Sequence, residues 1–158
     1  MSSLRHASIL SLLTAAACGA PPASGDAPAT EGPLSGRFRV REVIPGTVHA
    51  LPLEEARARI GRTASFLPAL ETPIVDCDAP TYRRRSVGTA TYLRDHRFPA
   101  LAEARARALG LLEGELVVFT ACCGEEETEI ASTSTGVVLM QEDGVHFVLA
   151  PEGSSAGR

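Results

Sequence analysis

The feature that most constrains the fold is one Asp-Gly pair near the end of the chain. Asp143-Gly144 separates two apolar runs in the segment VVLMQEDGVHFVL. Such a dipeptide favours a two-residue type I′ turn, because both positions of that turn have positive φ. A hairpin with this turn pairs Met140 with Phe147 and Val138 with Leu149 on one face. We therefore expect an antiparallel sheet with these four residues in its core.

Five further segments have the pattern of regular secondary structure. Residues 36–43 alternate arginines with Phe38 and Val40, which predicts a half-buried strand. Two segments have helical spacing, a Glu–Arg pair four residues apart and a glycine at or near the end, and these are 52–62 and 99–110. Two more have strand composition, and these are 116–121 and 128–133. The predicted fold class is mainly β (α+β), with two short helices.

The first seventeen residues differ from the rest of the chain. Arg5 and the free amine precede an apolar stretch from Ala7 to Leu13, and three small residues follow it. This is the layout of a secretory signal, and the apolar part is too short for a permanent membrane-spanning helix. We therefore expect residues 1–17 to be a signal peptide and the protein to be exported.

Residues Ala15-Ala16-Ala17-Cys18-Gly19 resemble the lipobox of bacterial lipoproteins, in which the cysteine is acylated and becomes the new N-terminus. The lipobox prefers leucine three residues before the cysteine, where this chain has Ala15. The resemblance implies a lipid on Cys18 that holds the protein at a membrane of the cell envelope, on the periplasmic face or in the outer membrane. Ordinary signal cleavage at the same site would instead leave Cys18 as a plain thiol.

The remaining chain divides by composition into three parts. Residues 18–35 are rich in Pro, Ala, Gly and Ser, which predicts a disordered spacer after the lipidation cysteine. Residues 36–150 form the single folded domain, and 151–158 are expected to be a flexible tail. The pI of 5.6 argues against a nucleic-acid partner. We expect a monomer.

Several short motifs in the domain resemble those of small exported bacterial lipoproteins of unknown function. They are Gly36-x-Phe38, Ile60-Gly61, Cys77-x-x-Pro80-x-Tyr82, Leu109-Gly110, Cys122 or Cys123, and Asp143-Gly144-x-x-Phe147. The group has tryptophan where this chain has Phe38, and one cysteine where this chain has two. The resemblance spans nearly the whole domain and implies an antiparallel calycin-like or lipocalin-like barrel, or a strongly curved sheet. It implies no activity.

The cysteines of an exported domain meet an oxidising compartment. We expect one structural disulfide from Cys77 to Cys122 or Cys123, because neighbouring residues of a strand point to opposite faces and only one can face Cys77. The bridge would close a loop of about 45 residues. The alternative is that Cys122-Cys123 forms a redox or soft-metal site, although such sites usually have Cys-x-x-Cys spacing and further ligands.

Other polar residues do not match a known catalytic or metal-binding pattern. The three histidines of the domain, His49, His96 and His146, lack metal-ligand spacing, and we expect His146 to face solvent or make one hydrogen bond. Ser132 and Ser134 have no Gly-x-Ser-x-Gly context. The acidic run Glu125–Glu127 with Glu129 is interpreted as a solvated loop, the alternative being a cation site. We predict no metal and no cofactor.

Two classes of function remain. The first is a non-catalytic binding or interaction module, for a small apolar ligand or an envelope protein. Its pocket would lie in the mouth of the barrel and would suit an amphipathic acid, with these lining residues: Phe38, Tyr82, Arg83, Arg85, Met140 and Phe147. In the simpler interpretation, apolar side chains fill the interior and the Arg83–Arg85 run is only part of a strand. The second class is a divergent hydrolytic or metal-dependent enzyme. A purely structural envelope lipoprotein is not separable from the first class by sequence.

Overall fold

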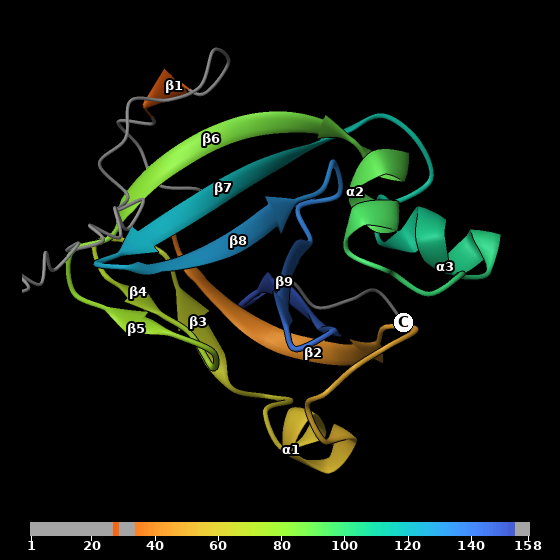
Figure 1. The fold of residues 1–158 in the computed structure, drawn as a ribbon, viewed down its shortest axis with the longest axis horizontal. Coiled ribbons are helices and arrows are strands. Elements are labelled where there is room, and N and C mark those ends of the chain that lie inside the picture. The colour runs from red at the N-terminus through yellow and green to blue at the C-terminus, as the bar shows by residue number, and fades with distance from the viewer. Residues whose placement is uncertain (1–26, 29–33, 154–158) are drawn as a thin grey trace, which may run out of the picture.

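The computed structural model describes residues 27–28 and 34–153. The expected signal peptide, 1–17, and the expected lipidation site, Cys18, lie outside the described residues. The domain is a strongly curved antiparallel sheet with three short helices (Figure 1). This confirms the mainly β fold class predicted from the sequence, with one helix more than expected.

The sheet has the strand order β1-β6-β7-β8-β9-β10-β2-β3-β4-β5. Its strands are β1 (Ala27–Pro28), β2 (Arg37–Pro45), β3 (Thr63–Ser65), β4 (Leu70–Glu71), β5 (Asp76–Cys77), β6 (Thr81–Gly88), β7 (Glu115–Cys123), β8 (Glu126–Ser132), β9 (Val138–Glu142) and β10 (Val145–Pro151). The helices are α1 (Leu53–Arg57), α2 (Thr89–Asp95) and α3 (Glu103–Ala108).

The predicted hairpin is β9 and β10. Asp143 and Gly144 have φ of 47° and 80°, as a type I′ turn requires at both positions. Met140 pairs with Phe147 and Val138 with Leu149, and all four side chains are buried. On its other side β10 pairs with β2, so the strand expected at 36–43 lies next to the last strand. Pairing continues to Pro151, one residue beyond the expected end of the domain.

The inner face of the sheet is the face on which the curved sheet packs against itself. Its buried cluster contains side chains of both ends of the sheet, including Phe66 after β3 and Tyr82 on β6. The Tyr82 hydroxyl donates a hydrogen bond of 2.6 Å to the carbonyl oxygen of Phe66. Within the described residues β5 and β6 are not paired, so the sheet is curved but not closed by hydrogen bonds.

The outer face carries the opposite residues of the same strands and is covered by α2 and α3 (Figure 1). Its buried cluster joins both helices to the middle strands through Ile44, Tyr92, Ala106, Leu109, Leu111, Leu116, Val118, Ala131, Leu139 and Val148. None of the helices among the described residues is long and apolar enough to cross a membrane. The domain therefore has two apolar layers, one on each face of the sheet.

The two predicted helices are present but shorter than the ranges 52–62 and 99–110. Neither α1 nor α3 has a side-chain hydrogen bond at its N-cap, which is occupied by Pro52 in α1 and Ala102 in α3. The predicted end at Gly110 is confirmed: its φ is 70°, and its amide and the next one donate to carbonyls of the last turn. Both predicted Glu–Arg pairs form ion pairs.

Candidate functional site

Two rows of opposite charge face each other across β7 on the outer face. Arg83 and Arg85 alternate along β6, and Glu127 and Glu129 alternate along β8. Arg83 Nη2 donates to Glu127 Oε1 at 2.6 Å, and Arg85 Nη2 donates to Glu129 Oε1 at 2.7 Å. The acidic run was interpreted as a solvated loop. That was wrong from Glu126 onward, because these residues form a strand opposite a second strand of matching charge period.

His96, the C-cap residue of α2, extends this row of charges to the helical layer. Its Nε2 lies 2.8 Å from Glu129 Oε2, and its Nδ1 lies 2.9 Å from the carbonyl oxygen of Tyr92. The imidazole also stacks on the Tyr92 ring, with 4.0 Å between ring centroids. Glu129 therefore holds Arg85 with one carboxylate oxygen and His96 with the other.

Both ring nitrogens of His96 face oxygen atoms that can only accept hydrogen bonds. The doubly protonated imidazolium is the form that satisfies both contacts. The hydrogen bond to Glu129 accordingly raises the pKa of His96. The same bond, together with Arg85, lowers the pKa of Glu129 to about 2. His96 has no free lone pair with which to accept a substrate proton, so in this geometry it clamps α2 to the sheet.

His146 is the second buried imidazole of the outer face. It lies on β10, is 1% exposed, and packs against the Phe98 ring with 4.2 Å between ring centroids and 39° between the ring planes. Its Nε2 has no hydrogen-bond partner among the described residues. Burial, and then the charge of His96, lower its pKa to about 4, so the ring is neutral at pH 7. The expectation that His146 faces solvent was wrong, because Phe98 in the connection between α2 and α3 covers it.

The residues of the predicted ligand pocket lie on two different faces of the sheet. Phe38, Tyr82, Met140 and Phe147 pack together in the inner cluster, and none is more than 8% exposed. The side chains of Arg83 and Arg85, which were also predicted to line the pocket, are on the outer face with their glutamate partners. Burial raises the pKa of Tyr82 to about 12. The structure thus brings the four apolar residues together and separates them from the two arginines.

The cysteines divide between the two faces as the sequence predicts for neighbours on a strand. Cys77 on β5 forms a disulfide with Cys123 on β7, with 5.9 Å between their Cα atoms. Cys122 is a buried free thiol. Of the two alternatives left open by the sequence, Cys123 is therefore the partner. Among the described residues no group of three or more His, Cys, Asp or Glu side chains is placed to hold a metal ion.

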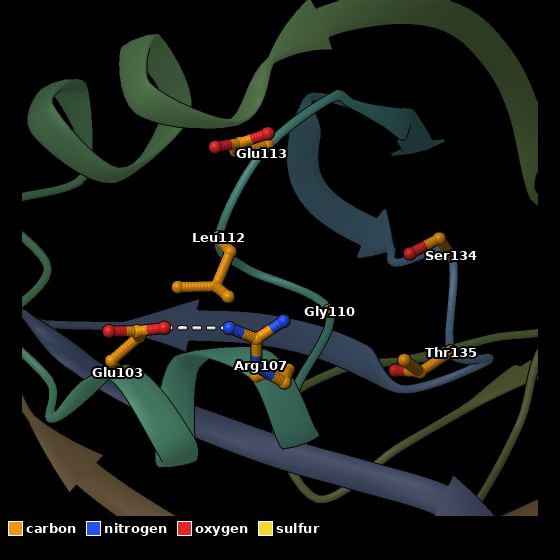
Figure 2. Close-up of a pocket in the computed structure, with 7 residues that line it drawn as sticks. All are labelled: Glu103, Arg107, Gly110, Leu112, Glu113, Ser134 and Thr135. Atoms are coloured by element: carbon orange, nitrogen blue, oxygen red, sulfur yellow. Dashed lines mark hydrogen bonds and ion pairs between the residues drawn. The ribbon is translucent and has the colours of Figure 1, made fainter.

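The surface also has open pockets, one of which lies between α3 and the turn after β8. Figure 2 shows Arg107 and its ion-pair partner Glu103 on α3, with Ser134 and Thr135 on the turn across from them. The pocket volume is about 470 Å³. No histidine lines it. Ser134, one of the hydroxyls considered in the sequence, therefore has no imidazole beside it in this pocket, while Ser132 lies on β8.

A second open pocket, of about 320 Å³, lies where α2 ends. It is lined by His49, His96 and Arg97 and by the hairpin turn. His49 is exposed there, and it is the one histidine of the domain whose side chain lies at the surface. Because the nitrogens of His96 are already bonded inside the protein, the polar lining of this pocket comes from backbone and from other side chains, which are those of His49, Asp95, Arg97, Gln141 and Asp143.

No family model matches this chain, and neither the curated proteins nor the solved structures contain a match.

Proposed function

We propose that this chain is an exported bacterial lipoprotein, anchored in the cell envelope by an acyl group on Cys18, whose domain is a non-catalytic binding or interaction module. The anchor rests on the signal-like segment, the lipobox-like stretch and the spacer that follows it. The observation that carries the non-catalytic function is the bonding of His96. The Glu129 carboxylate orients this imidazole, as in a catalytic histidine. Both of its nitrogens, however, are hydrogen-bonded to acceptors of the protein itself, Glu129 and the Tyr92 carbonyl.

The packing of the inner face favours a partner at the surface over a ligand inside the sheet. The side chains that would line an interior pocket are core residues, with exposed fractions of 3% for Phe38 and 1% for Met140 and Phe147. A small apolar ligand would have to displace them. An envelope protein that contacts the outer surface needs no such rearrangement, and we propose this kind of partner.

The anchor is tested by replacing its cysteine. Cys18→Ser should move the protein from the membrane fraction to the soluble envelope fraction, because one signal for membrane attachment is removed. The matched control is Cys122→Ser, which changes a buried thiol of the domain and should leave the fractionation unchanged. If the unaltered protein already fractionates as soluble, the anchor is wrong.

A further inference from the structure

The edge of the sheet carries a short strand from the segment expected to be a spacer. Ala27 and Pro28 form β1 and pair antiparallel with β6, Ala27 opposite Arg84 and Pro28 opposite Arg83. These two residues lie inside the range 18–35, for which the composition predicts no regular structure. Residues that precede the predicted start of the domain at Gly36 are therefore paired with the edge of β6.

The direction of β1 follows from its pairing with β6. Because β1 is antiparallel to β6, its C-terminal end points toward Thr81, where β6 begins. The start of β2 is at the same end, since Arg37 pairs with Ser65 and the carbonyl of the next residue, Phe66, accepts the Tyr82 hydrogen bond. The C-terminal end of β1 and the start of β2 therefore lie at the same end of the sheet.

We propose that β1 pins the spacer to the edge of β6, and that this edge is the side of the domain that faces the membrane; the inference rests on the proposed acyl group at Cys18. Ala27 is nine residues after Cys18, whereas Gly36 is eighteen residues after it. Nine residues span at most about 30 Å when fully extended. As a flexible chain they have a root-mean-square reach of about 17 Å. Pinning at Ala27 therefore brings the β6 edge close to the lipid surface.

The same pin turns other parts of the domain away from the membrane. Figure 1 shows β1 and β6 at one side of the molecule and α1 at the opposite side. Beside the pin, Arg84 is exposed and has no ion-pair partner among the described residues, unlike Arg83 and Arg85. An arginine at this place suits the anionic headgroups of a bacterial membrane. The side of the domain that carries α1 therefore stays accessible to a protein partner.

The test uses the full acylated protein in vesicles of phosphatidylethanolamine and phosphatidylglycerol that contain a headgroup-attached quencher. A fluorescent probe is placed at Ser86→Cys on β6 or at Arg57→Cys on α1, both exposed positions. A flexible Gly/Ser insert of about 20 residues is then added in one of two places. The first place is between Gly19 and Ala20, before the pin, and the second is between Gly32 and Pro33, after it.

We expect stronger quenching at position 86 than at position 57. The first insert should reduce quenching at position 86, because the root-mean-square reach to Ala27 rises to about 30 Å. The second insert should leave it unchanged, because the pin lies on the membrane side of that insert. Equal loss with both inserts, or equal quenching at both probe positions, would overturn the pinned orientation. Failure of the protein to float with the vesicles would instead refute the anchor itself.

Discussion

At the scale of single residues, one carboxylate joins the helical layer to the sheet. Glu129 lies on β8 and bonds Arg85 of β6 and His96 at the end of α2. Its side chain is 34% exposed, so water screens part of these interactions. The neighbouring pair, Arg83 with Glu127, is nearer to solvent, because the Glu127 side chain is 48% exposed. The two glutamates therefore differ in burial.

Replacing Glu129 with Gln should therefore cost more than the same change at Glu127. We expect Glu129→Gln to lower the free energy of unfolding by about 1–2 kcal/mol, because Arg85 and a half-buried His96 lose a charged acceptor. Glu127→Gln is the matched control and should cost less than about 0.5 kcal/mol. Urea unfolding at pH 6 measures both. Equal costs would contradict a special role for Glu129.

His96 and His146 make the free energy of unfolding depend on pH in opposite directions. The pKa of His96 is raised in the folded state, so its stabilisation is complete below its ordinary pKa of 6.5 and is lost as the pH rises through the folded pKa. The pKa of His146 is lowered to about 4, so the unfolded chain takes up its proton first. The His146 contribution therefore falls as the pH drops from about 6.5 to about 4.

His146→Leu should remove the acid part of this dependence. Between pH 7 and pH 5 we expect the wild type to lose roughly 1–2 kcal/mol through His146, since each pKa unit corresponds to about 1.4 kcal/mol. The variant lacks this contribution and should lose correspondingly less over the same interval. Urea unfolding at the two pH values, for both proteins, gives the comparison. An identical loss in wild type and variant would show that His146 does not titrate on unfolding.

At the scale of secondary-structure elements, the sequence predicted the parts whose signals are local. The Asp143-Gly144 turn, the register of β9 and β10, and the two Glu–Arg ion pairs, one from α1 to Arg59 and one within α3, follow from residues close together in the chain. The burial of Phe38 and Val40 also has a local signal, because these residues alternate with arginines along β2.

The rest depends on contacts between distant segments. The helix α2 was not predicted, because it is held by the burial of Tyr92 and the Glu129 contact rather than by a cap. The burial of His146 depends on Phe98, which is far from it in sequence. One signal was present but overlooked. Arg-x-Arg at 83–85 and Glu-x-Glu at 127–129 share a period of two, which places like charges on one face of each strand.

The hairpin turn is also the place where a glycine is most needed. A Cβ at Gly144 would lie 2.1 Å from the carbonyl oxygen of Val48, in addition to the cost of a φ of 80°. Gly124, in the turn between β7 and β8, has a φ of 67° but nothing within 4 Å of such a Cβ. A comparison of substitutions at the two glycines therefore distinguishes the cost of backbone strain from the cost of a steric clash.

We expect Gly124→Ala to cost about 1–2 kcal/mol, from the left-handed backbone alone. Gly144→Ala should cost a further 1–3 kcal/mol or so, because the loop that contains Val48 must move. Thermal unfolding of the two variants measures the difference. A Gly144→Ala variant no less stable than Gly124→Ala would show that the loop accommodates the methyl group freely.

The disulfide joins β5, the last strand at one end of the sheet, to β7, which lies near the other end and is not hydrogen-bonded to β5. Cys77 and Cys123 are 46 residues apart, so loss of the bridge should cost about 3–4 kcal/mol in the chain-entropy model. Cys123→Ala should show this loss, while Cys122→Ala keeps the bridge and removes only one buried sulfur atom. Thiol counting on the denatured, unreduced domain should find one free cysteine. Three free thiols would contradict the bridge.

At the scale of the whole molecule, the domain is filled on both faces of its sheet and carries its polar contacts outside. The inner cluster leaves the interior to apolar side chains, and the outer cluster is covered by α2 and α3. We propose that the protein acts through its surface and through its position in the cell. In this proposal the acyl group at Cys18 determines that position, so it is the central claim.

The most direct measurement is the mass of the N-terminal peptide of the protein isolated from the bacterial envelope. An anchored lipoprotein predicts a peptide that begins at Cys18 and carries the added mass of acyl chains on that residue. The anchor would be contradicted by a peptide that begins at Cys18 or nearby without added mass, or by one that still contains residues 1–17.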